Sequence, residues 1–397
     1  MSLKKAKEII RQLHKNGHEA YIVGGVVRDQ LLGRPLGDID IATSAIPEMV
    51  QRIFEKTIPV GIEHGTVIVR MEGESFEVTT FRKEGEYEDF RHPSEVVFHD
   101  SIEKDLSRRD FTVNAMALSS DGKIIDPYSG KEDLANKLIR AVGNAEDRFQ
   151  EDPLRMMRAL RFISTLGFHL HQDTRLALIS CGPLLKKVSV ERIREEFTKL
   201  LLGRHCEQAL KCIKEMRLDP FLPSGPFALT FNQVTKYDWN HLETAVERWA
   251  GLLIRIGVER PYDWLNEWKL PTILRKRISE LVQIIRAEPD FSCDLTLYHY
   301  GVEQMVSASN VKRFMNEDPG VSEKHILNRY DQLSLKDRSQ LAIDGNDLMD
   351  MVKRTPGPWI AEILEEIEQR VVKGEVKNTF PDIKEWINEC KRPLESD

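Results

Sequence analysis

Two aspartates alternate with two isoleucines in the segment from Asp38 to Ile41. This alternation predicts a β-strand, because successive side chains along a strand point to opposite faces of the sheet. The isoleucines would face the core, and Asp38 and Asp40 would share the other face. Two carboxylates so placed could hold Mg²⁺, which prefers a few carboxylates together with water and substrate phosphates. A pair of ions about 3.5–4 Å apart could activate a hydroxyl and stabilise a pyrophosphate leaving group, as in nucleotidyl transfer.

An isolated pair of alternating acids more often marks a solvated strand face than a metal site. Here a Gly-Gly pair at 24–25 precedes the acids and leads into a predicted helix. Free backbone N–H groups at a helix N-terminus favour phosphate, and Arg28 could add a charge-assisted contact to a triphosphate. Glu77 is a further acid in a predicted strand. Each feature is ordinary alone, but together they indicate a site for a metal-bound nucleotide.

Hydrophobic periodicity predicts the elements that position these residues. Apolar residues at helical spacing between Leu3 and Leu13 are followed by Gly17, where a helix C-cap is expected. Three further segments are predicted as strands: 20–23, 65–71 and 75–81. The N-terminal third of the chain is therefore predicted to be mixed α/β.

From about Asp147 onward, apolar residues recur at spacings of three and four, as at Ile193, Phe197 and Leu200. This period predicts that the rest of the chain is helical. Breaks rich in Pro and Gly at 219–227 and at 354–359 divide it into successive helical modules.

Composition indicates a globular, cytoplasmic protein. The sequence is 41% hydrophobic and 30% charged, no apolar run approaches the roughly 20 residues of a membrane helix, and the N-terminal segment does not resemble a signal peptide. The five cysteines form no CxxC pair, so free thiols are expected. The net charge of -7 argues against a broad grip on nucleic acid. Any RNA site must be local, and residues 151–211, with eleven Lys and Arg against seven Asp and Glu, are a candidate.

Asp152 and Arg155 stand three residues apart in a segment predicted to be helical, and would therefore be neighbours on one face. Each further three-residue step slips by about 60°, because a helix turns about 100° per residue. Arg158 could still reach the same site, whereas Arg161 is expected to face a phosphate, an RNA strand or a structural acid. The alternative for the first two residues is a surface salt bridge, worth only about 0.2–0.5 kcal/mol.

An aspartate beside an arginine offers a hydrogen-bond acceptor next to a donor. Cytosine and adenine each present an exocyclic amino group next to a ring nitrogen acceptor, so both fit. Uracil and guanine would place a carbonyl oxygen against the carboxylate, at a cost of about 1–3 kcal/mol or more. Such a pair could select CTP and ATP without a nucleic-acid template.

Four segments, in this order, resemble the class II family of CCA-adding enzymes (tRNA nucleotidyltransferases) and bacterial poly(A) polymerases. They are GGVVRD, DIDIAT, RRDFTVNAM (108–116) and EDPLRMMRALRF (151–162). The resemblance is close over roughly the first 200 residues. It implies a polymerase-β-like α/β head with a mixed sheet, followed by an all-α neck, body and tail. The expected bounds are 1–140, 141–205, 206–285 and 286–397.

The resemblance also implies roles for single residues. Asp38 and Asp40 would bind two Mg²⁺ ions, and Glu77 and Arg109 would join them as catalytic residues. The residues implied in nucleotide binding are Gly25, Arg28, Arg109, Asp152, Arg155, Arg158 and Arg161. The roles of Asp110 and Asn114 in the family motif are left open.

The stretch between Phe81 and Arg108 is too charged for a core and long enough to be mobile. It is either a plain linker or, as the resemblance implies, the flexible loop that helps CCA-adding enzymes switch from C to A. Relatives that add only CC lack this loop, so its presence favours CCA addition. The acidic net charge also suits a tRNA enzyme better than a poly(A) polymerase, which must bind RNA of any sequence.

The predicted reaction adds C, C and A in sequence to the 3′ end of tRNA. The RNA 3′-hydroxyl would attack the α-phosphate of CTP twice and of ATP once, releasing pyrophosphate, while the helical modules hold the acceptor stem and elbow of the tRNA. A poly(A) polymerase and a CC-adding enzyme are alternatives of the same class, and a catalytically inactive RNA-binding relative is one of a different class. The oligomeric state is open, and a homodimer is one option.

Overall fold

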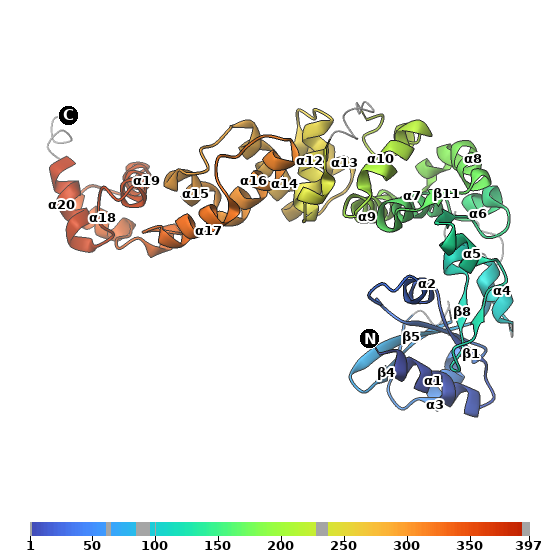
Figure 1. The fold of residues 1–397 in the computed structure, drawn as a ribbon. Coiled ribbons are helices and arrows are strands. Elements are labelled where there is room, and N and C mark those ends of the chain that lie inside the picture. Colours follow the sequence, from blue (N-terminus) through green and yellow to red (C-terminus); the bar gives the residue numbers. More distant parts are fainter. Residues whose placement is uncertain (1, 61–64, 85–95, 100, 228–236, 391–397) are drawn as a thin grey trace. The chain divides into compact units, whose positions relative to one another are not determined.

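The computed structural model of the chain describes residues 2–60, 65–84, 96–99, 101–227 and 237–390. The chain divides into two compact units, whose elements are labelled in Figure 1. The first unit comprises Met1–Thr235 together with Trp264–Leu270, and the second comprises Lys236–Asp263 together with Pro271–Asp397. The first unit contains every site residue that the sequence predicts.

A mixed seven-stranded sheet forms the N-terminal part of the first unit. Its strands in spatial order are β3 (Thr57–Pro59), β4 (Thr66–Met71), β5 (Glu74–Thr80), β2 (Asp40–Thr43), β1 (Ala20–Val23), β8 (Ala117–Leu118) and β9 (Ile124–Ile125). β2 and β5 run parallel, and the other neighbouring pairs are antiparallel. The predicted strands are confirmed, but β2 begins only at Asp40, so Asp38 lies just before it.

The register of the sheet brings two of the predicted acids together. Asp40 in β2 lies opposite Glu77 in β5, and side chains of directly paired residues point to the same face. Ile39 and Ile41 are each 1% exposed and occupy the opposite face. The predicted alternation of acids and isoleucines is therefore confirmed.

Helices cover the sheet because its apolar side chains alternate toward both faces. α1 (Leu3–Lys15) buries the predicted apolar stripe and contacts β1 and β2, while α3 (Pro47–Ile53) contacts β4 and β5. The two helices lie side by side (Figure 1). On the other face, α4 (Ile102–Ser107) adds Ile102 and Leu106 to a core that contains Val23 and Ala42.

The polar stretch after Phe81 is ordered at both of its ends. It contains the antiparallel pair β6 (Arg82–Glu84) and β7 (Val96–Phe98) and then α4, which buries apolar residues in the core of the sheet. The expectation that this stretch is too charged for a core is therefore wrong at α4. Residues 85–95 and 100, on which the predicted flexible loop falls, lie outside the described residues.

Several short elements lie beside the sheet or between it and the helices. They are α2 (Gly25–Leu31), η2 (Thr112–Asn114), α5 (Gly130–Ala135) and the parallel pair of β10 (Leu138–Ile139) with β11 (His169–Leu170). The expectation that everything beyond Asp147 is helical is wrong at β11, a two-residue strand whose pairing partner belongs to the α/β part.

Helices make up most of the remainder of the first unit. They are α6 (Ala145–Glu151), α7 (Leu154–Leu166), α8 (Gln172–Cys181), η3 (Gly182–Lys187), α9 (Val190–Leu201), α10 (Cys206–Glu215) and η4 (Asp219–Phe221). The apolar stripe of α9 packs on α7, as its period predicts. The returning segment contributes Trp268, which is completely buried with its ring 4.6 Å from that of Phe197.

The described part of the second unit is helical, as predicted. Its elements are η5 (Trp239–His241), α12 (Ala245–Arg255), α13 (Pro261–Glu267, which ends in the returning segment), α14 (Thr272–Arg286), α15 (Asp294–Tyr300), α16 (Val302–Phe314), α17 (Glu323–Gln332), η6 (Arg338–Gln340), α18 (Gly345–Val352), α19 (Trp359–Val372) and α20 (Phe380–Cys390). α12, α14 and α16 pack on one another, and a separate apolar core includes Leu348, Ile367 and Ile383 from α18, α19 and α20. None of the helices in the described ranges is long and apolar enough to cross a membrane.

Candidate active site

A cavity of about 430 Å³ in the first unit brings together residues from the sheet, from α2 and from α7. Its lining residues are Gly24, Gly25, Arg28, Asp40, Arg109, Asp110, Asn114, Asp152, Leu154, Arg155, Arg158, Arg161, Phe162 and Arg192. Eight of the ten predicted site residues are among them. The two others, Asp38 and Glu77, do not line the cavity. The volume lies in the range of small-molecule sites, about 300–1,000 Å³.

The glycine pair lets two arginines approach the backbone closely. Gly24 has φ +79°, in the left-handed region that favours glycine. A Cβ added at Gly24 would lie 3.1 Å from Nη1 of Arg109, and one at Gly25 would lie 3.3 Å from Nη2 of Arg28. The Nε of Arg109 is buried without a hydrogen-bond partner among the described residues. Two guanidinium groups beside a bare backbone turn are suited to bind a polyphosphate.

Asp40 is the predicted metal ligand that lines the cavity. Burial and the neighbouring Glu77 raise the pKa of Asp40 to about 6, with a smaller contribution from Asp38, although Arg109 acts in the opposite direction. The shift places all three predicted acids close enough for their charges to interact. No described residue donates a hydrogen bond to the Asp40 carboxylate, so its charge is poorly compensated by the protein itself.

This acidic group fits a divalent cation. Among the described residues, no group of three or more His, Cys, Asp and Glu side chains has the arrangement of a metal site. Magnesium, however, needs only one or two carboxylates when water and substrate phosphates complete its coordination. A cation would also offset the repulsion that raises the pKa of Asp40.

Arg28 is fixed by a chain of hydrogen bonds. It donates to both carboxylate oxygens of Asp29, at 3.0 and 2.9 Å, and to Oδ1 of Asn114 at 2.6 Å. Asn114 in turn donates to Asp110 at 3.1 Å, and the guanidinium of Arg28 lies 5.2 Å from the ring centre of Phe162. Asn114, whose role the sequence left open, thus holds Arg28 in place.

Asp110 connects this network to α7. Its Oδ2 accepts from Arg158 at 2.6–2.7 Å, and its Oδ1 accepts from Asn114 and from the backbone N–H of Phe111. Burial alone would raise the pKa of Asp110, but Arg158 and these hydrogen bonds outweigh it and lower the pKa to about 2. Asp110 is therefore a fixed negative charge that positions two side chains of the cavity.

Asp152 is not part of a helix, and the predicted pairing with Arg155 is wrong. It has an extended backbone between α6 and α7 (φ −139°, ψ 99°), because a residue before proline disfavours the helical region and Pro153 follows. Its Oδ1 accepts from the N–H of Leu154, and its Oδ2 accepts from Arg192 of α9 at 2.8 Å. The expected partner is therefore replaced by an arginine 37 positions further along the chain.

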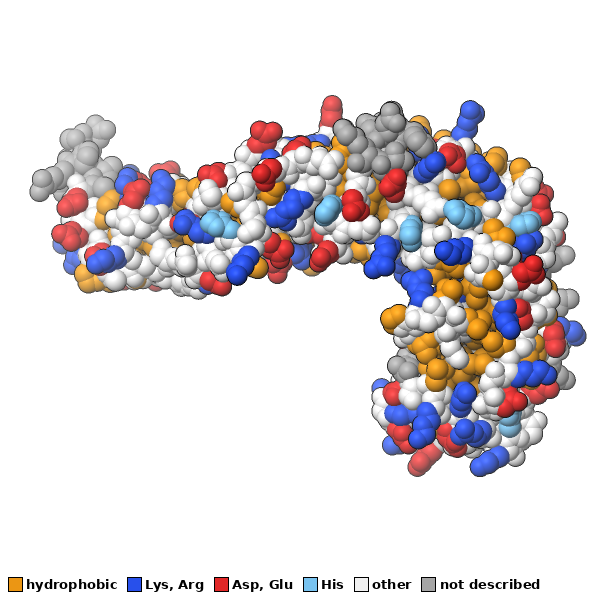
Figure 2. Space-filling model, in the orientation of Figure 1, with side chains coloured by type: hydrophobic (Ala, Val, Ile, Leu, Met, Phe, Trp, Pro, Cys, Tyr) orange, Lys and Arg blue, Asp and Glu red, His pale blue; other side chains and the backbone are white. Residues whose placement is uncertain are grey.

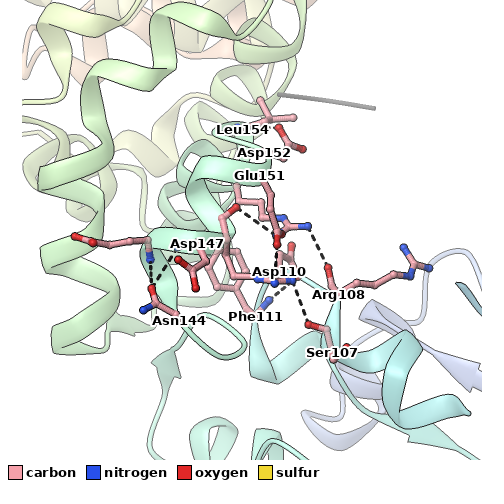
Figure 3. A network of polar contacts seen from close by, with 12 residues as sticks. Ser107, Arg108, Asp110, Phe111, Asn144, Asp147, Glu151, Asp152 and Leu154 are labelled. Carbon is pink, nitrogen blue, oxygen red and sulfur yellow. Dashed lines mark hydrogen bonds and ion pairs between the residues drawn. The ribbon is translucent and has the colours of Figure 1, made fainter. Parts of the chain in front are cut away.

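Arg155 is held by other acceptors. It donates to Oε2 of Glu151 at 2.7 Å and to the carbonyl oxygens of Arg148 and Arg108. Figure 3 shows Glu151, Asp152 and Leu154 near Arg108 and Asp110, where the end of α6 meets the loop after α4. Asp152 and Arg155 both line the cavity even though they do not pair.

Arg161 is bound by the structural acid that the sequence suggested. Its Nε lies 3.1 Å from Oε2 of Glu196 in α9. The further expectation, that Arg161 could not face the same site as Asp152, is wrong, because both line the cavity. The break at Pro153 shifts Asp152 off the helical positions on which that expectation relied.

Comparison with known proteins decides the family. A CCA-adding enzyme of Bacillus cereus (strain ATCC 10987 / NRS 248) is 46% identical over 394 residues, which cover 98% of each chain. The chain belongs to the family of CCA-adding enzymes. A CCA-adding enzyme of Bacillus anthracis (strain CDC 684 / NRRL 3495) is 45% identical, again over 98% of both chains.

Domain and structure comparisons agree with this place in the CCA-adding enzyme family. Residues 20–140 match the family described as "Poly A polymerase head domain", 167–225 match "Probable RNA and SrmB- binding site of polymerase A", and 240–387 match a second domain of tRNA nucleotidyltransferases. The crystal structure of the Bacillus stearothermophilus CCA-adding enzyme in complex with CTP has a TM-score of 0.92 and 41% identity. The match covers 100% of this chain and 99% of that one. The predicted polymerase-β-like head with helical modules is thereby confirmed.

Sequence reasoning missed Arg192, which lines this CCA-adding enzyme cavity, and Glu196, which does not line it but pairs with Arg161. Arg192 carries no signal in its own segment, because its partner Asp152 is distant along the chain. Glu196 does have a signal: it interrupts the apolar stripe of Ile193, Phe197 and Leu200 in α9, and a buried acid requires a cation or donor. The arginines of α7, to which the sequence alone assigns no buried acid, are the candidates for that cation.

Proposed function

We propose that this CCA-adding enzyme adds C, C and A to the 3′ end of tRNA, using CTP and ATP and releasing pyrophosphate, in tRNA maturation and repair. The observation that carries the proposal is one cavity in which Asp40 and the Gly24–Gly25 turn meet Asp152 and Arg192. Asp40 and the turn would bind the phosphates of a nucleotide, and Asp152 and Arg192 would contact its base. A nucleotide bound across the cavity would present its α-phosphate to the acids.

On the phosphate side, Arg28 and Arg109 are proposed to bind the triphosphate and to stabilise the departing pyrophosphate. Both are positioned before a nucleotide arrives, Arg28 by Asp29 and Asn114, and Arg109 by Asp105 at 3.1 Å. Pre-positioned donors need no reorganisation during the reaction, which is the largest source of electrostatic catalysis.

Asp38 and Asp40, with Glu77 beside them, are the proposed ligands of the catalytic metal. We propose that the metal is Mg²⁺ and that two ions act together, since nucleotidyl transfer must assist both an attacking and a leaving oxygen. Such ions, when bound, make a hydroxyl a better nucleophile and neutralise charge on pyrophosphate. The chain's own contribution is to keep the acids together on one face of β2 and β5.

On the base side, Asp152 is proposed to accept a hydrogen bond from the exocyclic amino group of cytosine or adenine. Its two oxygens are fixed by Leu154 and Arg192, so the carboxylate offers its remaining acceptor positions in one direction. Arg155, Arg158 and Arg161 are proposed to donate to ring nitrogens, to the ribose or to phosphate. Uracil and guanine, with a carbonyl oxygen in place of the amino group, would be rejected.

The roles of the helical modules and the cellular compartment follow from this reaction. The helical modules at 141–205, 206–285 and 286–397 are proposed as neck, body and tail, with body and tail holding the tRNA. Because tRNA, CTP and ATP are substrates, we infer that the enzyme works in the cytoplasm. The predicted loop that would switch specificity from C to A falls on residues outside the described ranges.

The test is stepwise extension of a tRNA transcript that lacks its CCA end, with Mg²⁺ and labelled nucleotides. CTP alone should add two residues, ATP alone should add none to this transcript, and both together should add three. Long runs of A would identify a poly(A) polymerase, and arrest at two residues in the presence of ATP would identify a CC-adding enzyme. No incorporation at all would indicate an inactive RNA-binding relative.

A further inference from the structure

Arginines are concentrated in the cavity of the candidate active site. Six arginines and three aspartates are among the described residues that line it, whereas the chain as a whole has 57 Lys and Arg against 64 Asp and Glu. On the face shown in Figure 2, side chains of both charges are interspersed. Like charges gathered in a hollow repel one another until a bound anion offsets them. The nucleotide-free enzyme must therefore hold its arginines together by other means.

One aromatic side chain contacts three of these arginines. Among the described residues that line the cavity, Phe162 is the one aromatic residue. The guanidinium carbons of Arg28, Arg158 and Arg161 lie 5.2, 5.8 and 4.6 Å from the centre of its ring. All three distances fall within the roughly 6 Å at which a ring face attracts a cation. Arg28 belongs to α2 and the other two arginines to α7, so the ring joins two elements.

The fold fixes the position of this ring. Phe162 is 4% exposed in α7, and its ring packs edge-on against the ring of Phe111, with the ring centres 5.7 Å apart and the planes at 89°. A ring edge carries a partial positive charge and a ring face a partial negative charge, so this contact orients the ring. Phe162 therefore presents a defined surface to the arginines before a nucleotide binds.

Hydrogen bonds hold two of the three arginines more firmly than the third. Arg28 and Arg158 donate hydrogen bonds of 2.6–3.0 Å to neighbouring carboxylates and to an amide oxygen. Arg161 faces Glu196, whose Oε2 lies 3.1 Å from its Nε but accepts no hydrogen bond from the described residues. The hydrogen bond that joins these two side chains is 3.4 Å long. Arg161 therefore depends most on its other close contact, the ring of Phe162.

The three guanidinium groups also repel one another. Burial lowers the pKa of Arg161 below its ordinary value, although Glu196 opposes this shift. Arg158 and Arg28 lower this pKa further, because like charges disfavour the charged form. A ring face stabilises a cation without adding a negative charge to the cavity, whereas a further acid would repel the phosphates of a nucleotide.

We propose that Phe162 is a positioning residue, whose ring holds Arg28, Arg158 and Arg161 together in the nucleotide-free cavity and so prepares them for CTP or ATP. The inference rests on the proposed function, in which these arginines bind the nucleotide. A ligand that binds only the gathered arrangement has an apparent Kd equal to its intrinsic Kd divided by the fraction of molecules in that arrangement. This fraction should fall when the ring no longer attracts the arginines.

The experiment replaces Phe162 in the full-length enzyme by phenylalanines that carry one, two or three ring fluorines. Fluorine weakens the attraction of the ring face for cations, while the side chain nearly keeps its shape. The Kd for CTP, measured by calorimetry, should rise about 2-fold with each fluorine and reach about 10-fold for three, as the gathered fraction falls to about one tenth. Thermal unfolding checks that each variant is folded.

Two ordinary substitutions test the same ring face. Phe162→Tyr keeps the aromatic face and should bind CTP within about 2-fold of the wild type, whereas Phe162→Leu lacks it and should raise the Kd by about 10-fold. The matched control carries the same fluorinated residues at Phe149, which is completely buried in α6 and does not line the cavity. This control should keep the wild-type Kd.

A Kd for CTP that does not depend on the number of fluorines at Phe162 would overturn the proposal. So would an equally steep dependence when Phe111 is fluorinated instead, because the effect would then come from the packing of the two rings. Weakening by Phe162→Tyr as large as that by Phe162→Leu would count against the ring face in the same way.

The same measurements separate this proposal from the proposed function. If the wild type fails to add C, C and A but its Kd for CTP depends on the fluorines at Phe162, the proposed function fails and the role of Phe162 stands. If the wild type adds C, C and A and the dependence is flat, the function stands and the role of Phe162 fails. A wild type that does not bind CTP would overturn both.

Discussion

At the scale of single residues, the proposed metal chemistry depends most on Asp40. Its carboxylate lies on the face of the sheet shared with Glu77, and its pKa is raised to about 6 by burial and by that neighbour. A carboxylate that receives so little compensation from protein donors gains most from a bound cation. Arg109, which approaches within reach of the Gly24 turn, opposes the shift only in part.

Replacing Asp40 by asparagine should therefore abolish nucleotide addition while the fold is kept. The loss should be at least about 100-fold in kcat, because metal-assisted charge stabilisation contributes several kcal/mol. Initial rates with CTP and tRNA measure it, and thermal unfolding checks the fold. Glu48→Gln, at an exposed acid in the first turn of α3, is the matched control. Full activity of the Asp40 variant would show that the metal site does not include Asp40.

Base selection should depend on Arg192 as well as on Asp152. Removing Arg192 frees Oδ2 of Asp152, so the proposed acceptor is no longer held in place. Both Asp152→Ala and Arg192→Ala should raise UTP incorporation relative to CTP by about 5- to 150-fold, the equivalent of about 1–3 kcal/mol. Competition assays with both nucleotides measure this ratio. The control Asp147→Asn, at an exposed position, should leave this ratio unaltered. Unaltered selectivity in both test variants would show that Asp152 and Arg192 do not select the base.

The residue types and their order were predictable from the sequence, but several pairings were not. Asp152 was expected on a helix with Arg155, although Pro153 is a local signal for the break that the structure contains. The partner Arg192 could not be predicted, since its contact depends on how α9 packs on α7. Local periodicity predicts elements well, whereas contacts between distant elements depend on tertiary packing.

At the scale of elements, the turn before α2 lies close to Arg109, the arginine proposed to bind the triphosphate. Gly24 has a left-handed φ, and an added Cβ would approach Arg109, whereas Gly122 has φ +90° with nothing within 4 Å. Both Gly→Ala changes should destabilise the fold by about 1–2 kcal/mol from backbone strain. Activity under conditions where both variants are folded should fall only for Gly24→Ala. Equal activity of the two would show that the close approach to Arg109 is unimportant.

The contact of Asp110 with Arg158 links the segment before η2 to α7, and its strength should depend on pH. Because the pKa of Asp110 is lowered to about 2 in the folded state, against about 3.9 unfolded, the ionised form stabilises the fold above pH 4 by about 2–3 kcal/mol. This stability is lost as the pH falls from about 4 to about 2.

The check is the free energy of urea unfolding of Asp110→Asn and wild type at pH 7 and at pH 2.5. The difference between them should be large at pH 7 and should shrink in acid. Asp147→Asn, at an exposed position, should show little difference at either pH. A difference for Asp110→Asn that does not change with pH would contradict the assigned shift.

At the scale of the whole molecule, the units are not continuous in sequence. The chain leaves the first unit near residue 235 and returns with Trp264–Leu270. Nothing in the helical period of this segment distinguishes it from its neighbours, so the sequence could not predict the return. It follows from the packing of Trp268 against Phe197.

Trp268→Ala should therefore destabilise the first unit by about 3–5 kcal/mol, the usual cost of removing a buried aromatic side chain. A fragment of residues 1–235 should be destabilised at least as much, because it lacks the whole segment. Tyr262→Ala, at a tyrosine that is 39% exposed, is the control. A fragment as stable as the intact chain would contradict the division.

In the proposed reaction, the enzyme selects every added nucleotide in one cavity and so builds a defined sequence without a nucleic-acid template. The most direct measurement gives the wild-type enzyme a tRNA transcript lacking its CCA end, all four nucleotides at equal concentration and Mg²⁺, and sequences the products. The predicted result is termini that read CCA and stop. Tails of A, termini that stop at CC, or mixed sequences containing U and G would contradict it.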